Sequence, residues 1–231
     1  MKKKGKLIVI DGADGVGKAT QAKLLLARLK KEGKKVQTMD FPQYEKNFFG
    51  SLIGKALTGV YGDFIALDPH IASVLYAADR FESKSILEKW LAQGCIVVLD
   101  RYVSANQIHQ GGKISDVKKQ KEFIDWLEKM EFGVFQLPRP DMILYLDVPI
   151  EISEKLLEEK QSFSKKQYSK GKKDLAESDL KHQSDARVNA LRIVKKNNRW
   201  VKIACSEKGI FLSRGIIAER IWHEVKKSKK L

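Results

Sequence analysis

Short apolar runs alternate with longer amphipathic stretches along the 231 residues of this chain. Residues 7–10 read Leu-Ile-Val-Ile and residues 96–99 read Ile-Val-Val-Leu. Such uninterrupted runs are typical of strands that are buried on both faces. We predict strands at residues 6–11, 35–41, 95–100, 142–146 and 200–205. The stretches between them carry apolar residues at helical spacing, which predicts helices at residues 18–31, 68–91, 115–129, 150–160, 174–197 and 214–225.

Strands that are separated by helices predict an α/β fold, a five-stranded parallel sheet with helices on both faces. Asp68 and Pro69 give one helix a good start signal, an N-cap residue followed by proline in the first turn. Residues 43–62 are rich in turn formers and aromatics, and residues 161–173 are polar and lysine-rich, so we expect a mobile loop in the latter. No repeat or linker divides the chain, and we expect a single domain over residues 1–231.

The composition narrows the class of protein. No apolar run approaches the roughly 20 residues that a bilayer crossing needs. Cys95 and Cys205 each lie in a predicted strand with no metal-ligand spacing, which favours a reducing compartment, and we expect the cytoplasm. The formal charge of +15 favours polyanionic partners, nucleic acid or small phosphorylated molecules. Most lysines are mixed with glutamates on predicted helices, as on a solvated surface.

A glycine-rich loop follows the first predicted strand and opens the first predicted helix. Its glycines allow consecutive N–H groups to point at an anion, the helix dipole adds positive potential, and Lys18 supplies a full charge. We therefore predict a nucleotide-phosphate site. It consists of Gly12, Ala13, Asp14, Gly15, Val16, Gly17, Lys18, Ala19 and Thr20. Ala19 stands where a Ser or Thr ligand of Mg²⁺ is usual, so a carboxylate elsewhere must help to hold the metal.

Asp100 is the natural carboxylate for that metal, because it ends the third predicted strand and ligands gather at the carboxyl ends of parallel strands. Arg101 follows it and can reach a phosphate with its planar fork. Asp14 would repel bound phosphates, and its presence makes sense if it accepts a hydrogen bond from a substrate hydroxyl or binds a cation or water. A GTPase is disfavoured because the guanine-reading pattern Asn-Lys-x-Asp is absent.

A second set of motifs resembles the thymidylate kinase family of P-loop nucleoside monophosphate kinases, and the resemblance covers nearly the whole chain. Tyr76 and Arg80 share one helix face at i, i+4 spacing, which gives the acceptor half an aromatic surface and a cation. The motifs occur in the family's order. They are Gly-Lys-x-Thr-Gln at residues 17–21, Phe41-Pro42, Ala78-Asp79-Arg80, Asp100-Arg101-Tyr102 and Leu-Pro-Arg-Pro-Asp at residues 137–141.

The resemblance implies a three-layer P-loop NTPase fold with a mobile lid at about residues 161–176. It implies transfer of the ATP γ-phosphate to dTMP, with Mg²⁺, giving dTDP and ADP for dTTP biosynthesis, and a homodimer. Lys18, Arg101 and Asp14 would be catalytic. Tyr76 would stack on thymine, Arg80 would contact the base edge or the monophosphate, Asn106 would read the nucleotide, and His109 would crowd the 2′ side of the sugar. The implied dTMP-binding residues are Asp14, Phe41, Tyr76, Arg80, Arg101, Asn106 and His109, with Asp100 at the metal. Tyr76 and Phe41 could instead be core residues.

The chain departs from the family pattern around the transferred phosphate. Tyr44 stands where many members carry arginine, and Leu175 replaces another arginine at the end of the lid. The phosphate loop has Gly15, and no arginine occurs between Arg139 and Arg187, so the lid cations are lysines. Lysine supplies charge without bidentate geometry. The lid lysines are Lys160, Lys165, Lys166, Lys170, Lys172 and Lys173.

Two other functions stay open at this point. One is a kinase for another monophosphate, such as dUMP. The other is a basic nucleic-acid-binding protein on the same scaffold, suggested by the +15 charge and the missing lid arginine. Because aromatics barely interleave with the lysine clusters and no nucleic-acid module is present, we expect ATP and dTMP as partners, with no specific nucleic acid and no membrane.

Overall fold

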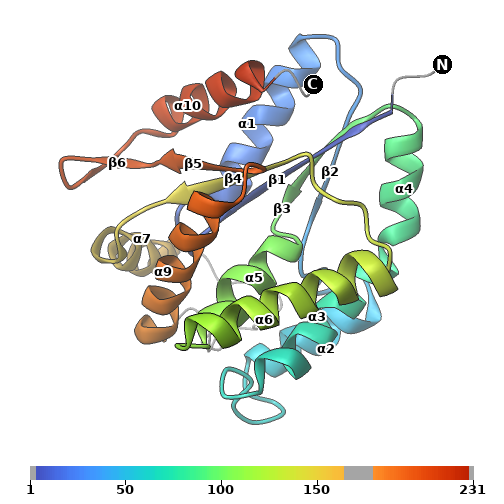
Figure 1. Ribbon diagram of the computed structural model, residues 1–231. Helices are drawn as coiled ribbons and strands as arrows, with labels where there is room; N and C mark the ends of the chain where they lie inside the picture. The colour runs from blue at the N-terminus through green and yellow to red at the C-terminus, as the bar shows by residue number, and fades with distance from the viewer. Residues whose placement is uncertain (1–3, 164–178, 229–231) are drawn as a thin grey trace.

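The computed structural model describes residues 4–163 and 179–228 and contains a five-stranded parallel sheet (Figure 1). Its strands are β1 (Lys6–Gly12), β2 (Val36–Asp40), β3 (Ile96–Asp100), β4 (Met142–Asp147) and β5 (Trp200–Ala204). All five correspond to predicted strands, and their order is β2-β3-β1-β4-β5. In the register, Ile10 pairs with Asp100 and Gly12 with Leu146, so the carboxyl ends of β1, β3 and β4 meet at one edge.

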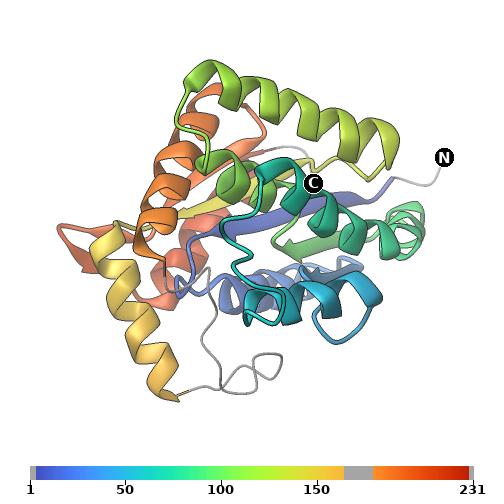
Figure 2. The ribbon, with the colours of Figure 1, turned by 90° about the horizontal axis from the view of Figure 1, so that it is seen from below.

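Helices cover both faces of the sheet, as the α/β pattern predicts (Figures 1 and 2). They are α1 (Lys18–Lys31), α2 (Phe48–Leu57), α3 (Pro69–Glu82), α4 (Lys84–Ala92), α5 (Val103–Gly112), α6 (Val117–Glu128), the π-helix η1 (Lys129–Val134), α7 (Ile150–Phe163), α9 (Leu180–Lys196) and α10 (Arg214–Lys227). A small antiparallel hairpin, β6 (Ser206–Glu207) and β7 (Ile210–Phe211), follows β5.

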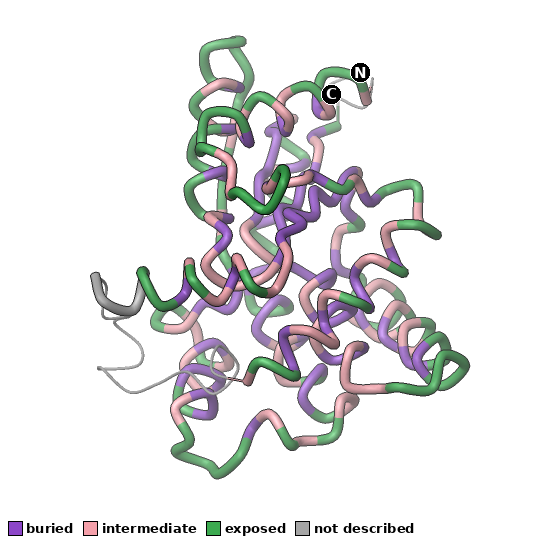
Figure 3. The backbone as a smooth tube through the Cα atoms, turned by 90° about the vertical axis from the view of Figure 1, so that its left-hand side faces the viewer, coloured by how far each residue is buried: buried purple, intermediate pink, exposed green. Residues whose placement is uncertain are grey.

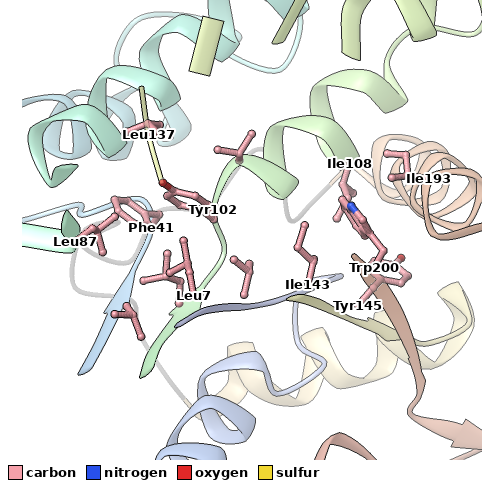
Figure 4. Packing of buried hydrophobic residues seen from close by; sticks show 14 of the residues in the cluster. Leu7, Phe41, Leu87, Tyr102, Ile108, Leu137, Ile143, Tyr145, Ile193 and Trp200 are labelled. Atoms are coloured by element: carbon pink, nitrogen blue, oxygen red, sulfur yellow. The ribbon is translucent and has the colours of Figure 1, made fainter. Parts of the chain in front are cut away.

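Side chains that alternate along the strands build one core on each face of the sheet. Ile8 and Ile10 pack with α1 and α10 on one face, and Leu7 and Val9 pack with α4, α5 and α9 on the other. Figure 4 shows the second cluster, where Phe41 and Tyr102 meet beside Leu7. β1, β3 and β4 are buried along nearly their whole length, whereas β2 is exposed or half-buried (Figure 3). A separate small cluster joins α2 to α3. The strands are therefore fixed on both faces, and their carboxyl ends form a rigid base for a site.

The helix predictions need three corrections. The single helix predicted at residues 68–91 is wrong: α3 ends and α4 begins at Ser83, whose N–H bonds the Arg80 carbonyl. Helices α2 and α5 were not predicted. α2 is stabilised by its N-cap Asn47, whose side chain accepts from the Gly50 N–H at 2.7 Å. α5 packs closely on α9, where a Cβ on Gly112 would come within 2.9 Å of the Ala186 Cα. Tertiary packing, which a local pattern does not reveal, fixes α5.

The predicted helix at residues 174–197 begins at Leu180 within the described residues, capped by Asp179. The predicted mobile loop is wrong at its start, since residues 161–163 belong to α7. The rest of the predicted lid, including Lys165, Lys166, Lys170, Lys172 and Lys173, lies outside the described residues. Within the two described ranges, no helix combines the length and apolar character that a membrane crossing requires.

Candidate nucleotide site

The phosphate loop connects the buried end of β1 to α1. Gly15 and Gly17 have φ values of +80° and +86°, a conformation that L side chains rarely adopt. A Cβ on Gly15 would also lie 3.2 Å from Leu157 of α7. Backbone conformation thus favours glycine at both positions, and close packing adds a second requirement at Gly15. The first turn of α1 contains no acidic residue, so nothing there opposes the positive end of the helix dipole.

Lys18 begins α1 and is 8% exposed. Its Nζ donates to the carbonyls of Gly12 at 3.2 Å and Ala13 at 2.8 Å, and lies 3.6 Å from the Asp14 carboxylate. Burial lowers the pKa of Lys18 and Arg101 adds to this, whereas the neighbouring carboxylates oppose it. The loop therefore holds its lysine at the centre of the glycine turn. Ala19 and Thr20 are exposed on the first turn of α1.

Arg101 links the phosphate loop to α5. Its backbone has φ +63°, a strained conformation for a non-glycine residue. The guanidinium donates to the Asp14 carboxylate at 2.6 Å and lies 3.8 Å from Asp11. Burial alone would lower the pKa of Arg101, but the carboxylates of Asp14, Asp11 and Asp100 outweigh it and raise that pKa. The result is a fixed cation at the carboxyl ends of β1 and β3.

A pocket opens beside this cation. Its wall includes every residue that the sequence predicts for dTMP: Asp14, Phe41, Tyr76, Arg80, Arg101, Asn106 and His109. The structure thus brings together side chains from the phosphate loop, the end of β2, the helix α3 and the helix α5. Their ligand remains a prediction at this point.

One end of the pocket is built around Arg80, which is 2% exposed. Its Nε donates to Oε2 of Glu131 at 2.7 Å, its Nη2 donates to the other carboxylate oxygen, and its Nη1 donates to the Tyr102 carbonyl at 3.4 Å. Asn106 donates through Nδ2 to the Ser73 carbonyl and to Glu131, both at 3.2 Å. Both acceptors can only accept, so the Asn106 amide has one orientation, with Oδ1 left to accept from a ligand.

The opposite end of the pocket holds two stacked histidines. His109 of α5 and His182 of α9 have ring centroids 5.4 Å apart at 27°. Nη1 of Arg101 lies 2.9 Å from Nε2 of His109. An arginine can only donate, so Nε2 accepts and the His109 ring is neutral, with its proton on Nδ1. Burial, followed by the positive charge of Arg101, lowers the pKa of His109, and burial also lowers the pKa of His182.

The motif residues Phe41, Tyr76 and Asp79 also have structural contacts. The ring centroids of Phe41 and Tyr102 lie 5.8 Å apart, and Phe41 belongs to the core and also lines the pocket. The Tyr76 ring lies 5.8 Å from Phe64 and is half-buried. The Asp79 carboxylate accepts from the Gln43 N–H at 3.2 Å, and burial raises its pKa. Asp79 therefore fastens the loop after β2 to α3, which brings Phe41 over the pocket.

Sequence reasoning missed three polar residues of the site: Gln110, His182 and Glu131. Gln110 is 5% exposed, lines the pocket, and its Oε1 has no hydrogen-bond partner among residues 4–163 and 179–228. Its spacing of four residues from Asn106 would have suggested it, had the helix α5 been predicted. His182 belongs to α9, far along the chain, and no local signal connects it to the pocket. Glu131 interrupts an apolar stripe, which is a signal that we did not use.

Asp100 is the carboxylate that the sequence predicts as a ligand for Mg²⁺. Its side chain makes no hydrogen bond or ion pair within the described part of the chain, whereas Asp11 already accepts from Ser104 at 2.6 Å. Burial raises the pKa of Asp100, and Lys18 opposes this. One available carboxylate fits a cation that takes its other ligands from phosphates and water. No cluster of three or more His, Cys, Asp or Glu side chains that could hold a metal by itself occurs among those residues.

Comparison with known proteins identifies the family. A sequence profile described as thymidylate kinase matches residues 10–211. The thymidylate kinase of Mycobacterium tuberculosis is 30% identical over 147 residues, which are 64% of this chain and 68% of that protein. The human thymidylate kinase is 28% identical over 64% of this chain and 63% of its own length. A solved thymidylate kinase from Candida albicans has the same fold, with a TM-score of 0.72 and 24% identity over 98% of this chain and 93% of that one. This chain belongs to the thymidylate kinase family.

Proposed function

We propose that this chain transfers the γ-phosphate of ATP to dTMP, giving dTDP and ADP. The observation that carries the proposal is the pocket, whose hydrogen-bonding pattern is complementary to thymine at one end and to a phosphate at the other. The family membership supports the same reaction. The phosphate loop, which ends in Lys18, supports ATP as the donor.

The pattern at the Arg80 end matches the imide edge of thymine. Arg80 has five N–H donors, of which three are used on Glu131 and Tyr102, so two remain for a carbonyl such as O4. The Asn106 Oδ1 can accept from N3–H. Gln110 adds a buried amide whose Oε1 accepts from no donor among residues 4–163 and 179–228. Cytosine carries an amino group and a bare N3 at the same edge, so its amino donor would face the Arg80 donors and its N3 acceptor would face the Asn106 Oδ1 acceptor. Tyr76 and Phe41 would pack against the ring faces of the base.

At the other end, Arg101 and Asp14 would meet the monophosphate and the sugar. Arg101 offers a fork for phosphate oxygens, its guanidinium is held by the carboxylates of Asp14 and Asp11, and its backbone N–H donates to the Ile10 carbonyl at 3.0 Å. Asp14 can accept from a sugar hydroxyl. His109 would crowd the 2′ side and favour deoxyribose. Lys18 would neutralise charge on the transferred phosphate, because phosphoryl transfer depends mainly on positioning and on neutralisation of charge.

Mg²⁺ would be held by Asp100, phosphate oxygens and water. When bound, it would supply charge neutralisation between the donor phosphates. Asp100 would orient it at the carboxyl end of β3, beside the loop that carries Lys18.

A homodimer is the expected assembly. Ile71 and Val74 leave apolar surface exposed on one side of α3, at 55% and 40%. Light scattering after size exclusion would report twice the 26.3 kDa chain mass, and a monomer at micromolar concentration would contradict the assembly. The two cysteines are buried free thiols, which supports a reducing compartment such as the cytoplasm.

A turnover screen tests the reaction. The purified chain with ATP and Mg²⁺ is offered dTMP, dUMP, dCMP, dGMP, dAMP and the ribose counterpart of dTMP. We expect the highest kcat/KM with dTMP and ADP release that depends on the acceptor. Preference for dUMP would assign another acceptor to the same pocket, and the absence of turnover with every monophosphate would refute a kinase.

A further inference from the structure

Glu131 is a charged residue that is completely buried, at 0% exposed, at the base end of the pocket. It continues the buried stripe of α6, where Phe123 and Leu127 precede it at intervals of four residues. The backbone changes there from α-helix to the π-helix η1, and the Phe135 N–H bonds the Met130 carbonyl five residues earlier. π-helical turns are rare and occur often at functional sites. The burial of a carboxylate at the end of an apolar stripe, beside a π-helical turn, therefore suggests a functional role for Glu131.

Every contact of that carboxylate is made with a pocket residue. It accepts from Nε of Arg80 at 2.7 Å, from Nη2 of the same guanidinium, and from Nδ2 of Asn106 at 3.2 Å. All three partners are donors, so a proton on Glu131 would have no acceptor, and the carboxylate is ionised. Burial raises the pKa of Glu131, while Arg80 and Asn106 oppose the shift.

A buried ion pair of this kind contributes little net stability, because the desolvation of both charges offsets their attraction. Its effect on orientation is larger. The carboxylate and the Ser73 carbonyl each accept from Nδ2 of Asn106, so together they hold the amino group inward and leave Oδ1 to accept from a base. The carboxylate also fixes the plane of the Arg80 guanidinium, which decides where the two remaining N–H groups point.

We propose that Glu131 is a positioning residue that sets base specificity, by fixing Asn106 and Arg80 so that the pocket accepts an N–H and donates to a carbonyl at the Watson–Crick edge. The inference rests on the proposed function and deepens it. The acceptor class is a pyrimidine imide, thymine or uracil, and cytosine is excluded through Glu131 although Glu131 itself need not touch the base.

The test is Glu131→Gln, which keeps the shape and places one amide N–H against donors. The Ser73 carbonyl then remains as the one obligate acceptor beside Nδ2 of Asn106, so the amide is held less firmly and the rotated orientation, which presents Nδ2 to the base, becomes more populated. Isothermal titration calorimetry with dTMP and dCMP measures binding without catalysis. We expect the Kd for dTMP to rise about 10- to 100-fold and the dCMP/dTMP ratio of Kd values to fall at least about tenfold. We expect kcat at saturating dTMP to change less than about threefold.

Glu128→Gln is the matched control, because it is the same change three residues earlier on a half-exposed side chain that bonds Arg139 and Gln107. It should leave both Kd values unchanged. A folded Glu131→Gln variant with an unchanged ratio overturns the proposal, as does an equal loss for both nucleotides, which a purely structural role would give. If that variant does not fold, Glu131→Asp decides: its shorter carboxylate cannot reach Arg80 and Asn106 together, so a lower dCMP/dTMP ratio of Kd values is expected, and an unchanged ratio overturns the proposal. The proposed function is tested separately, by measuring turnover of dTMP by the unaltered chain.

Discussion

The two ends of the pocket are built on opposite principles. At the Arg80 end, a buried arginine and an asparagine donate to a buried carboxylate, and two N–H groups of Arg80 and the Asn106 Oδ1 remain for a ligand. At the Arg101 end, a strained arginine bridges Asp14 and a neutral histidine, and several cations and carboxylates lie within a few residues of the phosphate loop. The first end suits recognition of a base, whose charge and hydrogen-bonding groups do not change during the reaction. The second suits a phosphate whose charge changes during the reaction.

This difference predicts that substitutions at the two ends alter different kinetic constants. Losses at the base end should appear mainly in KM for the acceptor, because they remove binding that is equal in the ground state and the transition state. Losses at the phosphate end should appear mainly in kcat, because they remove interactions that are made only when charge moves.

The largest effect is expected for Arg80→Ala. It removes contacts to the base and leaves the Glu131 carboxylate buried without its cation. We expect KM for dTMP to rise roughly 30- to 1000-fold with ATP binding nearly intact, and the free energy of unfolding to fall by about 3–5 kcal/mol. Steady-state kinetics and denaturant unfolding measure the two effects. An unchanged KM for dTMP would place the base elsewhere.

At the phosphate end, Lys18→Ala should lower kcat by roughly 10²- to 10³-fold, because a buried cation no longer meets the transferred phosphate. KM for dTMP should change little, since Lys18 is absent from the wall of the acceptor pocket. Circular dichroism controls for folding. If kcat were preserved and only KM rose, the assignment of Lys18 to the transferred phosphate would be wrong.

Acidification should weaken the fold through the two histidines. His109 is faced by Arg101 and Lys18 as cations and Asp14 as an anion, and His182 by Lys113, Asp14, Asp179 and Asp185. The pKa values of both rings are lowered in the folded state, so below about pH 6.5 the unfolded chain takes up protons that the folded chain does not. The contribution of the two neutral histidines to the free energy of unfolding is therefore fully present above about pH 6.5. It falls as the pH drops, by up to about 1.4 kcal/mol per pH unit for each histidine.

Thermal unfolding between pH 7.5 and 5 measures this slope. His182→Phe keeps an aromatic ring on His109 and should flatten the slope, whereas His223→Gln, on the exposed side of α10, should not. If the His182→Phe variant and the unaltered chain have the same slope, His182 does not contribute to the acid sensitivity.

The smallest effect is expected for sugar selection. His109→Gly should relax the preference for dTMP over its ribose counterpart about three- to tenfold, because it removes a ring from the 2′ side while most dTMP activity is kept. The ratio of the two kcat/KM values is the measurement. Equal ratios in the two proteins would make His109 a structural residue only.

Much of the fold could be predicted from the sequence because β1, β3 and β4 are buried along nearly their whole length and appear as apolar runs. The phosphate loop could be predicted as well, since its glycines are required by the local backbone conformation. The helix α5 could not be predicted in this way. Gly111 and Gly112 end it, and its stability comes from close contact with Asn189 and Ala186 of α9. For the same reason Gln110 and His182 could not be placed: they reach the pocket through helix packing. Glu131 could have been suspected as a charge on an apolar stripe, but its partners are 25 and 51 residues away.

The central claim is that one pocket holds the base at Arg80 and the phosphate at Arg101. A crystal structure of the chain with dTMP and a non-hydrolysable ATP analogue tests it most directly. We predict thymine O4 within hydrogen-bond distance of Arg80, N3–H donating to Oδ1 of Asn106, and the monophosphate on Arg101 beside the phosphate loop. A monophosphate bound at Arg80, or a base bound outside the pocket, would contradict the account.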